Sequence, residues 1–263
     1  MTIALPGVRT ASHSTCEVII IEAFTDELRD HLHQQLAELC FGANAQNYPS
    51  IYSRAFAAAE FLRRYDEKDR TRKIGLVGEL LCHTLLPFLQ TPLESASVYF
   101  NKEEQSVKKG FDLTLTDNSG ELWYGEVKSS ASIATPTQSA LHSLLTAAAK
   151  DLYEKISEVN RPQLWLSAVT DTNIIVQTST AKTARDLLLN DLTLIQAKTR
   201  PNPNAVLFGV VFREPSTLDV SAEAAALHLN TSTLIKDKFN RVRAMAVRKA
   251  TLDAIVDSFR GIS

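Results

Sequence analysis

Two carboxylates and a lysine in the middle of the chain have the residue types and spacing of a hydrolytic site. Asp112 lies in the segment GFDLTL, and Glu126 and Lys128 lie in the segment WYGEVKSS. Because side chains alternate between the two faces of a strand, Glu126 and Lys128 are expected to share one face. Carboxylates bind divalent cations, and an ammonium neutralises charge on a phosphate. The three residues therefore suit metal-assisted hydrolysis of a phosphodiester.

The link between the two expected strands predicts that the carboxylates face each other. Residues 118–120 (NSG) fit a three-residue hairpin loop in which Gly takes the left-handed last position. Asp117 and Glu121 then close the hairpin, and counting back along both strands pairs Asp112 with Glu126. Like charges directly opposite each other are destabilising unless a cation lies between them. The alternative is a half-exposed hairpin face that carries ordinary charges.

A third carboxylate, Glu79, lies in an apolar run and is the only formally charged residue between positions 74 and 93. A buried carboxylate needs a cationic partner, which is either a metal ion or a buried arginine or helix end. Gly75 and Gly78 are poor helix formers. They would let the helix approach the sheet or a ligand closely.

Hydrophobic periodicity and capping residues predict an α/β fold, with helices on both faces of a mixed central sheet. The expected helices cover 25–40, 49–68, 72–87, 136–158, 181–198 and 232–259. The expected strands cover 16–23, 96–101, 110–116, 121–129, 163–170 and 205–213, with a short extended piece at 173–178. Residues 1–70 are expected to form a mostly helical extension with one short strand, and residues 71–263 the main domain.

Composition excludes several classes of protein. The 28 Lys and Arg against 30 Asp and Glu give a net charge of −2, which by itself points to no partner. Three widely spaced cysteines predict buried thiols, not a disulfide framework or a zinc site. The chain shows no signal-like segment and no apolar run near the roughly 20 residues that span a bilayer. We therefore expect a cytoplasmic protein with no membrane contact.

The near-neutral total hides an uneven distribution of charge. Residues 236–249 carry six bases and one acid, whereas residues 17–38 carry six acids and one base. A basic C-terminal helix would lie along a nucleic-acid backbone. Docking on an acidic partner and a simply solvated face are the alternatives. The candidate DNA contacts on this helix are Lys236, Lys238, Arg241 and Arg243.

The motifs resemble the PD-(D/E)xK nuclease superfamily, through GE at 78–79, GFD at 110–112 and EVK at 126–128. The resemblance implies a restriction-endonuclease-like αβββαβ core, with the helical N-terminal extension and the long C-terminal helix added to it. It also implies Mg²⁺ (or Mn²⁺) as cofactor and DNA as substrate. One departure is Phe111, which stands where the superfamily has a proline before the first acid.

The same resemblance assigns roles to five residues. Asp112, Glu126, Glu79 and the backbone carbonyl of Val127 would hold the metal, and Lys128 would be the catalytic lysine. That lysine would either orient or deprotonate a metal-bound water, or neutralise charge on the phosphate.

Three polar residues beyond the lysine are further candidate DNA contacts. Gln138, with His142 one turn later, stands near the position where RecB-like members carry a glutamine. Thr135 and Gln138 would equally form a capping box at the start of the helix. Ser129 and Ser130 would either donate to a phosphate or serve only as hydroxyls at the strand end.

At the level of the whole chain, the size and the GE…GFD…GEVKSS layout resemble the HamA (AbpA) family. These are the nuclease partners of the helicase HamB in Hachiman antiphage defence. The resemblance implies a hetero-complex in which the helicase holds the nuclease inactive until infection or DNA damage is sensed. The alternatives are a catalytically silent nucleic-acid-binding or regulatory subunit of the same fold, and an interaction protein whose paired acids are coincidental.

Overall fold

The computed structural model describes residues 5–42, 45, 47–90, 93–99, 110–175, 179–213, 220–235, 238–249 and 252–262. The strands are β1 (Val8–His13), β2 (Cys16–Ile21), β3 (Leu93–Ser95), β4 (Leu113–Asp117), β5 (Leu122–Ser130), β6 (Asn204–Phe212) and β7 (Arg241–Lys249). These described strands form one mixed seven-stranded sheet in the order β1-β2-β7-β6-β5-β4-β3. The central strands β2, β7, β6 and β5 are parallel, and the outer pairs are antiparallel.

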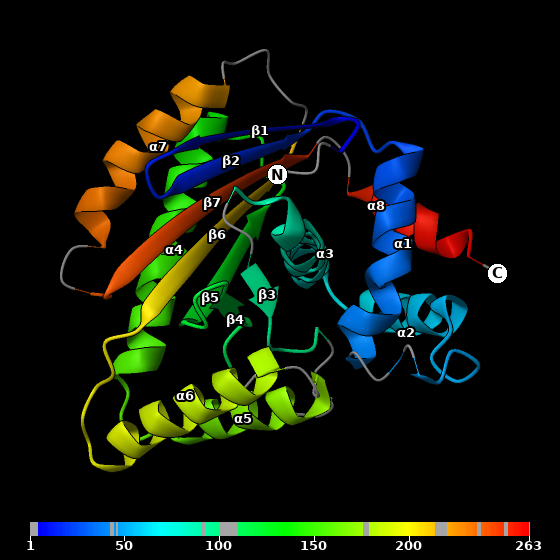
Figure 1. The fold of residues 1–263 in the computed structure, drawn as a ribbon. Coiled ribbons are helices and arrows are strands. Elements are labelled where there is room, and N and C mark those ends of the chain that lie inside the picture. Colours follow the sequence, from blue (N-terminus) through cyan, green and yellow to red (C-terminus); the bar gives the residue numbers. More distant parts are fainter. Residues whose placement is uncertain are drawn as a thin grey trace.

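Two layers of helices cover the sheet (Figure 1). The helices are α1 (Asp26–Phe41), α2 (Arg54–Asp66), α3 (Arg70–Leu85), α4 (Thr137–Ser157), α5 (Gln163–Ile175), α6 (Ser179–Gln196), α7 (Val220–Leu234) and α8 (Asp253–Arg260), with a 3₁₀ turn, η2, at Leu86–Phe88. Helices α1, α2, α3 and α8 share one hydrophobic core with the sheet. Helices α4, α5, α6 and α7 share the other. The predicted fold class is therefore confirmed.

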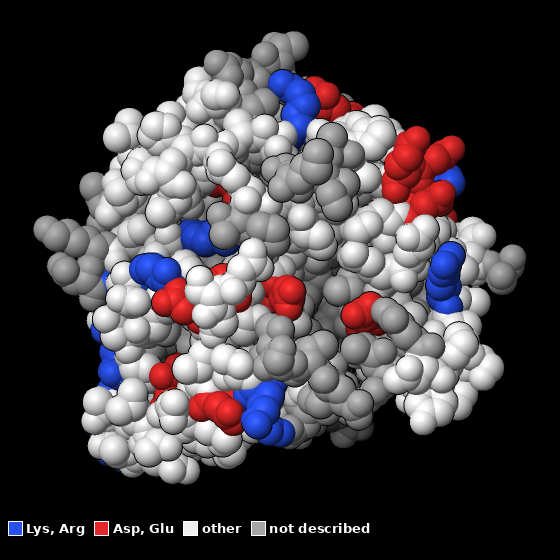
Figure 2. Space-filling model, in the orientation of Figure 1, with Lys and Arg blue, Asp and Glu red and all other residues white. Residues whose placement is uncertain are grey.

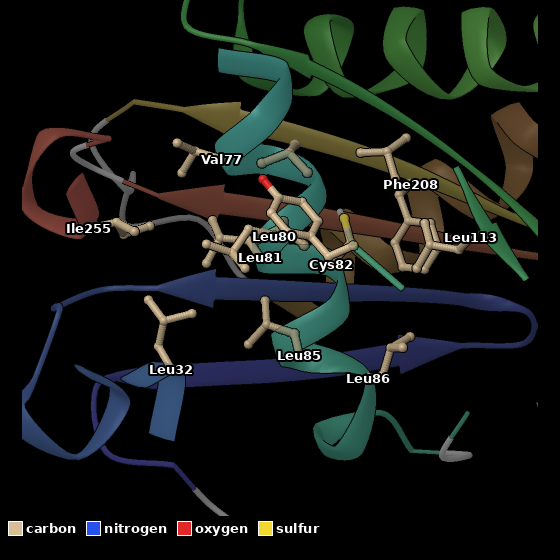
Figure 3. Close-up of a cluster of buried hydrophobic side chains, with 14 of the residues drawn as sticks. Leu32, Val77, Leu80, Leu81, Cys82, Leu85, Leu86, Leu113, Phe208 and Ile255 are labelled. Carbon is tan, nitrogen blue, oxygen red and sulfur yellow. The ribbon is translucent and has the colours of Figure 1, made fainter. Parts of the chain in front are cut away.

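The central strand β6 shows why the sheet needs both layers. All nine of its residues are buried, which is typical of a strand covered by helices on both faces. Val206 and Phe208 join the α3 core, whereas Ala205 and Leu207 join the α4 core. Figure 3 shows the α3 side, where Leu80 and its helical neighbours pack toward the strands. Each fully buried leucine of this kind contributes about 1.5–3 kcal/mol.

Several predicted elements are present with shifted ends. Helix α1 begins after Thr25, whose hydroxyl accepts a hydrogen bond from Leu28 N–H at 3.3 Å, as expected of an N-cap. The strand expected at 96–101 is instead β3, which ends at Ser95, and residues 100 and 101 lie outside the described residues. The core order from α3 to β6 contains the expected αβββα sequence, but α5 and α6 are inserted before β6.

The strand predicted at 163–170 is wrong, because this segment forms the first part of α5. Leu164 and Trp165 are both buried and Leu166 is 48% exposed. A half-buried strand alternates between its faces and does not give this pattern. Short apolar runs are ambiguous between helix and strand, and in the structure this segment packs as a helix against α6. Of the extended piece expected at 173–178, residues 173–175 belong to α5 and 176–178 lie outside the described residues.

The long C-terminal helix predicted at 232–259 is also wrong. The chain there leaves α7, forms the central strand β7 and ends in the short helix α8. Strand β7 pairs in parallel with β2 on one side and β6 on the other. Two neighbours that are distant in sequence therefore override the helical tendency of a segment rich in Ala, Arg and Lys.

The N-terminal segment contributes more to the sheet than predicted. One strand was expected before residue 70, but β1 and β2 form an antiparallel pair, and β2 continues the sheet beside β7. The division of the chain near residue 70 stays a prediction. All three cysteines are buried free thiols, as expected. Across the described ranges, no helix has both the length and the apolar character that crossing a bilayer requires.

Helix α3 approaches the sheet closely at Gly78. A Cβ added at Gly78 would overlap Ser129 Oγ on β5 and come within 2.9 Å of Ser129 Cβ. We therefore expect Gly78→Ala to lower the free energy of unfolding by about 1–3 kcal/mol, because the helix must move away from the strand. Chemical denaturation monitored by circular dichroism measures this.

Gly75 provides a matched control on the same helix. A Cβ at Gly75 would meet nothing within 4 Å. Gly75→Ala should therefore stabilise the protein by about 0.5–1 kcal/mol through helix propensity alone. Equal effects of the two substitutions would show that α3 does not need a glycine at its contact with β5.

Candidate active site

The hairpin between β4 and β5 has the predicted loop and register. Asp117 N–H donates to the carbonyl of Glu121 at 3.1 Å, and Gly120 at the end of the loop has a φ of 75°. The strand pairs keep this register to the last pair, Leu113 with Gly125, and Asp112 and Glu126 are the next residues on each side. The turn chemistry of three residues therefore brings two carboxylates together five residue pairs away.

These two carboxylates share one cation. Glu126 is 1% exposed, and Asp112 stands where β4 pairing ends, with its Oδ2 accepting from Val127 N–H at 2.9 Å. The ammonium of Lys155 on α4 lies 2.5 Å from Glu126 Oε2 and 3.5 Å from Asp112 Oδ1. The prediction that a cation lies between the two acids is thus met by a side chain of the protein itself.

The catalytic-lysine candidate belongs to the same set of contacts. Lys128 Nζ lies 2.9 Å from Glu126 Oε1 and 2.6 Å from Asp151 Oδ2. Charges alternate along the row Asp151, Lys128, Glu126, Lys155 and Asp112, which we call the charge ladder. Asp151 and Lys155 are one helical turn apart, about 6 Å, and Glu126 and Lys128 are two strand residues apart, about 6.6 Å. Because these two spacings are similar, the charged side chains of α4 can pair with those of β5.

The surroundings of the ladder perturb two of its members. Burial raises the pKa of Glu126, the Asp112 charge raises it further, and Lys155 and Lys128 act in the opposite direction. Burial lowers the pKa of Lys128, but the Glu126 and Asp151 carboxylates outweigh it and raise the pKa above its ordinary value. Lys128 therefore remains an ammonium at neutral pH. This environment favours charge neutralisation over proton abstraction among the roles predicted for it.

The donor set around Asp112 and Glu126 fits a hard divalent cation. Mg²⁺ binds through one or two carboxylates and completes its shell with waters and phosphate oxygens. Val127 adds a backbone donor, because the N–H and C=O of one strand residue point to the same side, and its N–H points to Asp112. The described part of the chain contains no group of three His, Cys, Asp or Glu side chains that could hold a metal on its own. Substrate and water would therefore complete the shell.

Glu79 approaches from the other layer. It lies half-buried on α3, which packs on the face of β5 opposite to α4. Burial raises the pKa of Cys82 well above its ordinary value, and the charges of Glu79 and Asp112 raise it further. Both carboxylates are therefore near this thiol. The role of Glu79 as a metal ligand stays a prediction.

The two serines after the lysine face opposite ways. Ser129 Oγ is buried against Gly78 on α3, so it is not placed to meet a substrate on the Lys128 face. Ser130 has the same strand parity as Lys128, and its Oγ accepts from Ser132 N–H at 3.1 Å. Of the two candidate phosphate contacts, only Ser130 stays on the side of the charge ladder.

Gln138 does not form the predicted capping box. Helix α4 begins at Thr137 with Pro136 as N-cap, and no side chain caps it. Gln138 is exposed in the first turn. The structural alternative for this residue is therefore wrong, and its contact with DNA stays a prediction.

The basic residues predicted for a C-terminal helix are dispersed instead. Arg243 lies on β7 with its side chain 12% exposed and its Nη2 3.0 Å from Glu17 Oε2. It therefore forms a largely buried ion pair within the protein and is not placed to bind DNA. Lys238 Nζ lies 5.8 Å from the centre of the Tyr153 ring. Lys236 lies outside the described residues.

Arg241 contacts the other end of the β4–β5 hairpin. Its guanidinium forms an ion pair with Glu121 and lies 4.8 Å from the Trp123 ring centre. Strand register places Arg241 beside Asn204 and Trp123, five residues along β5 from Lys128. At about 3.3 Å per residue, this position is offset from the charge ladder by roughly 16 Å along the strand direction.

Asp151 and Lys155 were not predicted from the sequence. Both precede buried positions of the α4 apolar stripe, Leu152 and Ile156, at helical spacing of four. An acid and a base at i and i+4 directly beside the buried stripe is the signal that could have found them. Such pairs are more often solvated, as Lys150 and Glu154 are here, with side chains 71% and 62% exposed.

Below the ladder on the same face of β5, a buried network joins the strand to α5 and α6. Tyr124 OH donates to Asp191 Oδ2 at 2.6 Å and accepts from Trp165 Nε1 at 3.2 Å. Burial raises the Tyr124 pKa well above its ordinary value, and Asp191 raises it further. Tyr124 thus remains a neutral donor that holds β5 in place beneath Glu126.

Fold and site together define an α/β protein in which Glu126 and Lys128 lie on one face of the central strand β5, and Asp112, just before β4, joins them. The chain belongs to the HamA family: the family model described as HamA matches residues 7–260. Membership indicates a component of Hachiman antiphage defence. Searches among curated proteins and among solved structures find no significant match. The predicted whole-chain resemblance is confirmed, and membership of the PD-(D/E)xK superfamily stays a prediction.

The Tyr124 network gives a stability prediction. Tyr124→Phe leaves Asp191 and Trp165 without their shared hydroxyl partner in a buried position. We expect the free energy of unfolding to fall by about 1–3 kcal/mol, measured by denaturation. Tyr48→Phe is the control, since Tyr48 is 57% exposed, and it should have almost no effect. An unchanged free energy of unfolding in Tyr124→Phe would show that the network does not anchor β5.

Proposed function

We propose that this protein is a Mg²⁺- or Mn²⁺-dependent nuclease that hydrolyses DNA phosphodiester bonds as the effector subunit of a Hachiman system. The observation that carries the proposal is the register that sets Asp112 opposite Glu126, with Lys128 on the same face. Opposed carboxylates are costly for a sheet and useful for a cation. Membership of the HamA family supports the defence role.

Each residue of the site has a distinct part in this chemistry. Asp112, Glu126 and the Val127 carbonyl would hold the metal, and Glu79 would contribute from α3. The bound metal would polarise the phosphate and activate a water. Lys128, kept as an ammonium by Glu126 and Asp151, neutralises charge that develops on the phosphate oxygens. The buried position of Glu126 excludes bulk water from one side of the site.

A partner would supply much of the affinity for DNA. Figure 2 shows Lys and Arg interspersed with Asp and Glu over the face drawn, not gathered into one basic area. Arg243 and Arg241 are engaged with Glu17 and Glu121. Nucleic-acid affinity depends on phosphate neutralisation by accessible cations. A helicase subunit of the HamB kind, bound in a hetero-complex, would present the DNA to this site.

One observation favours a second candidate, a catalytically silent regulatory subunit of the same fold. Each charge of the ladder is paired with another of its members. Such a ladder would serve equally to fasten α4 to β5. In that case the protein binds DNA or the helicase without cutting, and the site residues affect stability alone.

Substitution of the site separates the two candidates. We expect Glu126→Gln and Lys128→Met each to reduce plasmid cleavage in Mg²⁺ by about 10²–10³-fold or more, because each removes a group that stabilises charge in the transition state. Cleavage is followed on gels with the protein alone and with its helicase, and chelation of the metal should abolish it.

The controls come from the same helix. Lys150→Met and Glu154→Gln change exposed charges on α4 and should cleave like the wild type. If Glu126→Gln and Lys128→Met also cleave like the wild type, the site is assigned wrongly. DNA binding without cleavage under every condition would establish the silent subunit instead.

A further inference from the structure

Lys155 occupies the place that a shared metal ion would need. Its ammonium contacts one oxygen of each acid, Glu126 Oε2 at 2.5 Å and Asp112 Oδ1 at 3.5 Å. Both acids are metal ligands in the proposed function. A divalent cation bound by both would need the same lone pairs and would repel an ammonium beside it. The ammonium and the metal therefore exclude each other.

The backbone of Lys155 is fixed, but its side chain can turn toward solvent. The next residue, Ile156, is fully buried, and so is Leu152 one turn before, which anchors this part of α4. The Lys155 side chain is 24% exposed, so its flexible four-carbon stem reaches solvent without movement of the helix. A rotamer change is enough to vacate the position between the acids.

We propose that Lys155 is a built-in counter-ion that competes with the divalent metal for Asp112 and Glu126. This inference rests on the proposed function, since the metal is that of the nuclease site. Without metal, Lys155 stabilises a buried carboxylate pair that would otherwise repel. With metal, Lys155 turns toward solvent. The residue therefore sets the metal concentration at which the site is loaded.

The first test measures metal binding directly. Titration calorimetry with MnCl₂ on Lys155→Met should give a dissociation constant at least about tenfold lower than that of the wild type, because a like charge has been removed from the site. Lys155→Arg keeps the charge and should bind Mn²⁺ as weakly as the wild type. Lys150→Met, which alters an exposed lysine of the same helix, is the matched control and should leave the constant unchanged.

The second test uses the wild-type protein, so it does not depend on whether a variant folds. The Lys155 ammonium should react slowly with an amine-acylating reagent while it lies between the acids, and severalfold faster in saturating Mg²⁺. Mass spectrometry after digestion quantifies the modification at Lys155 and at Lys150. Lys150 should react at the same rate in both conditions.

The outcomes distinguish this inference from the function on which it rests. If the wild type and Lys155→Met bind Mn²⁺ equally, and Mg²⁺ does not change labelling of Lys155, the competition is overturned and the metal site stands. Weaker binding by Lys155→Met would also overturn the competition, because it would make Lys155 a supporting group. If neither protein binds Mn²⁺, the metal site and the inference fall together.

Discussion

A cation must lie between Asp112 and Glu126, and the rest of the structure follows from that requirement. The hairpin register places one acid opposite the other, and Glu126 is 1% exposed, so water cannot screen their repulsion. Helix α4 supplies the ammonium of Lys155 as a counter-ion. Strand β5 supplies a second ammonium, that of Lys128, which also contacts Asp151. A five-membered row of alternating charge results, with one more acid than base. That residual negative charge is what makes a metal ion an acceptable replacement for the lysine.

Helical layers cover the site on both faces of the sheet. Gly78 lets α3 contact β5 on one face, and α4 packs on the other, where Gly209 of β6 lies next to Lys128 and an added Cβ would make ordinary van der Waals contact with Leu145. Close packing on both sides excludes water from Glu126 and fixes the backbone positions of the residues in the charge ladder. Tyr124, joined to α5 and α6, supports the strand from below. The site is thus held by regular elements and not by loops.

Local chemistry explains which features could be predicted from the sequence. The register of Asp112 and Glu126 followed from the turn at 118–120, because a hairpin loop sets its own strand pairing. The identity of the cation did not follow, because Lys155 reaches the acids only once α4 has packed on β5. Strand β7 was missed for the same reason, since both of its partners are remote in sequence. With the basic helix gone, the case for DNA binding moves from Arg241 and Arg243 to a partner.

In the proposed mechanism, Asp112 and Glu126 form a metal site from which Lys155 withdraws. Anomalous diffraction from crystals soaked in MnCl₂ would locate the metal, because manganese gives a signal that the protein and water do not. We expect one anomalous peak between the two carboxylates, next to the Val127 carbonyl, with the Lys155 side chain turned toward solvent. A saturated crystal in which Lys155 still joins the two acids, with no peak beside them, would contradict it.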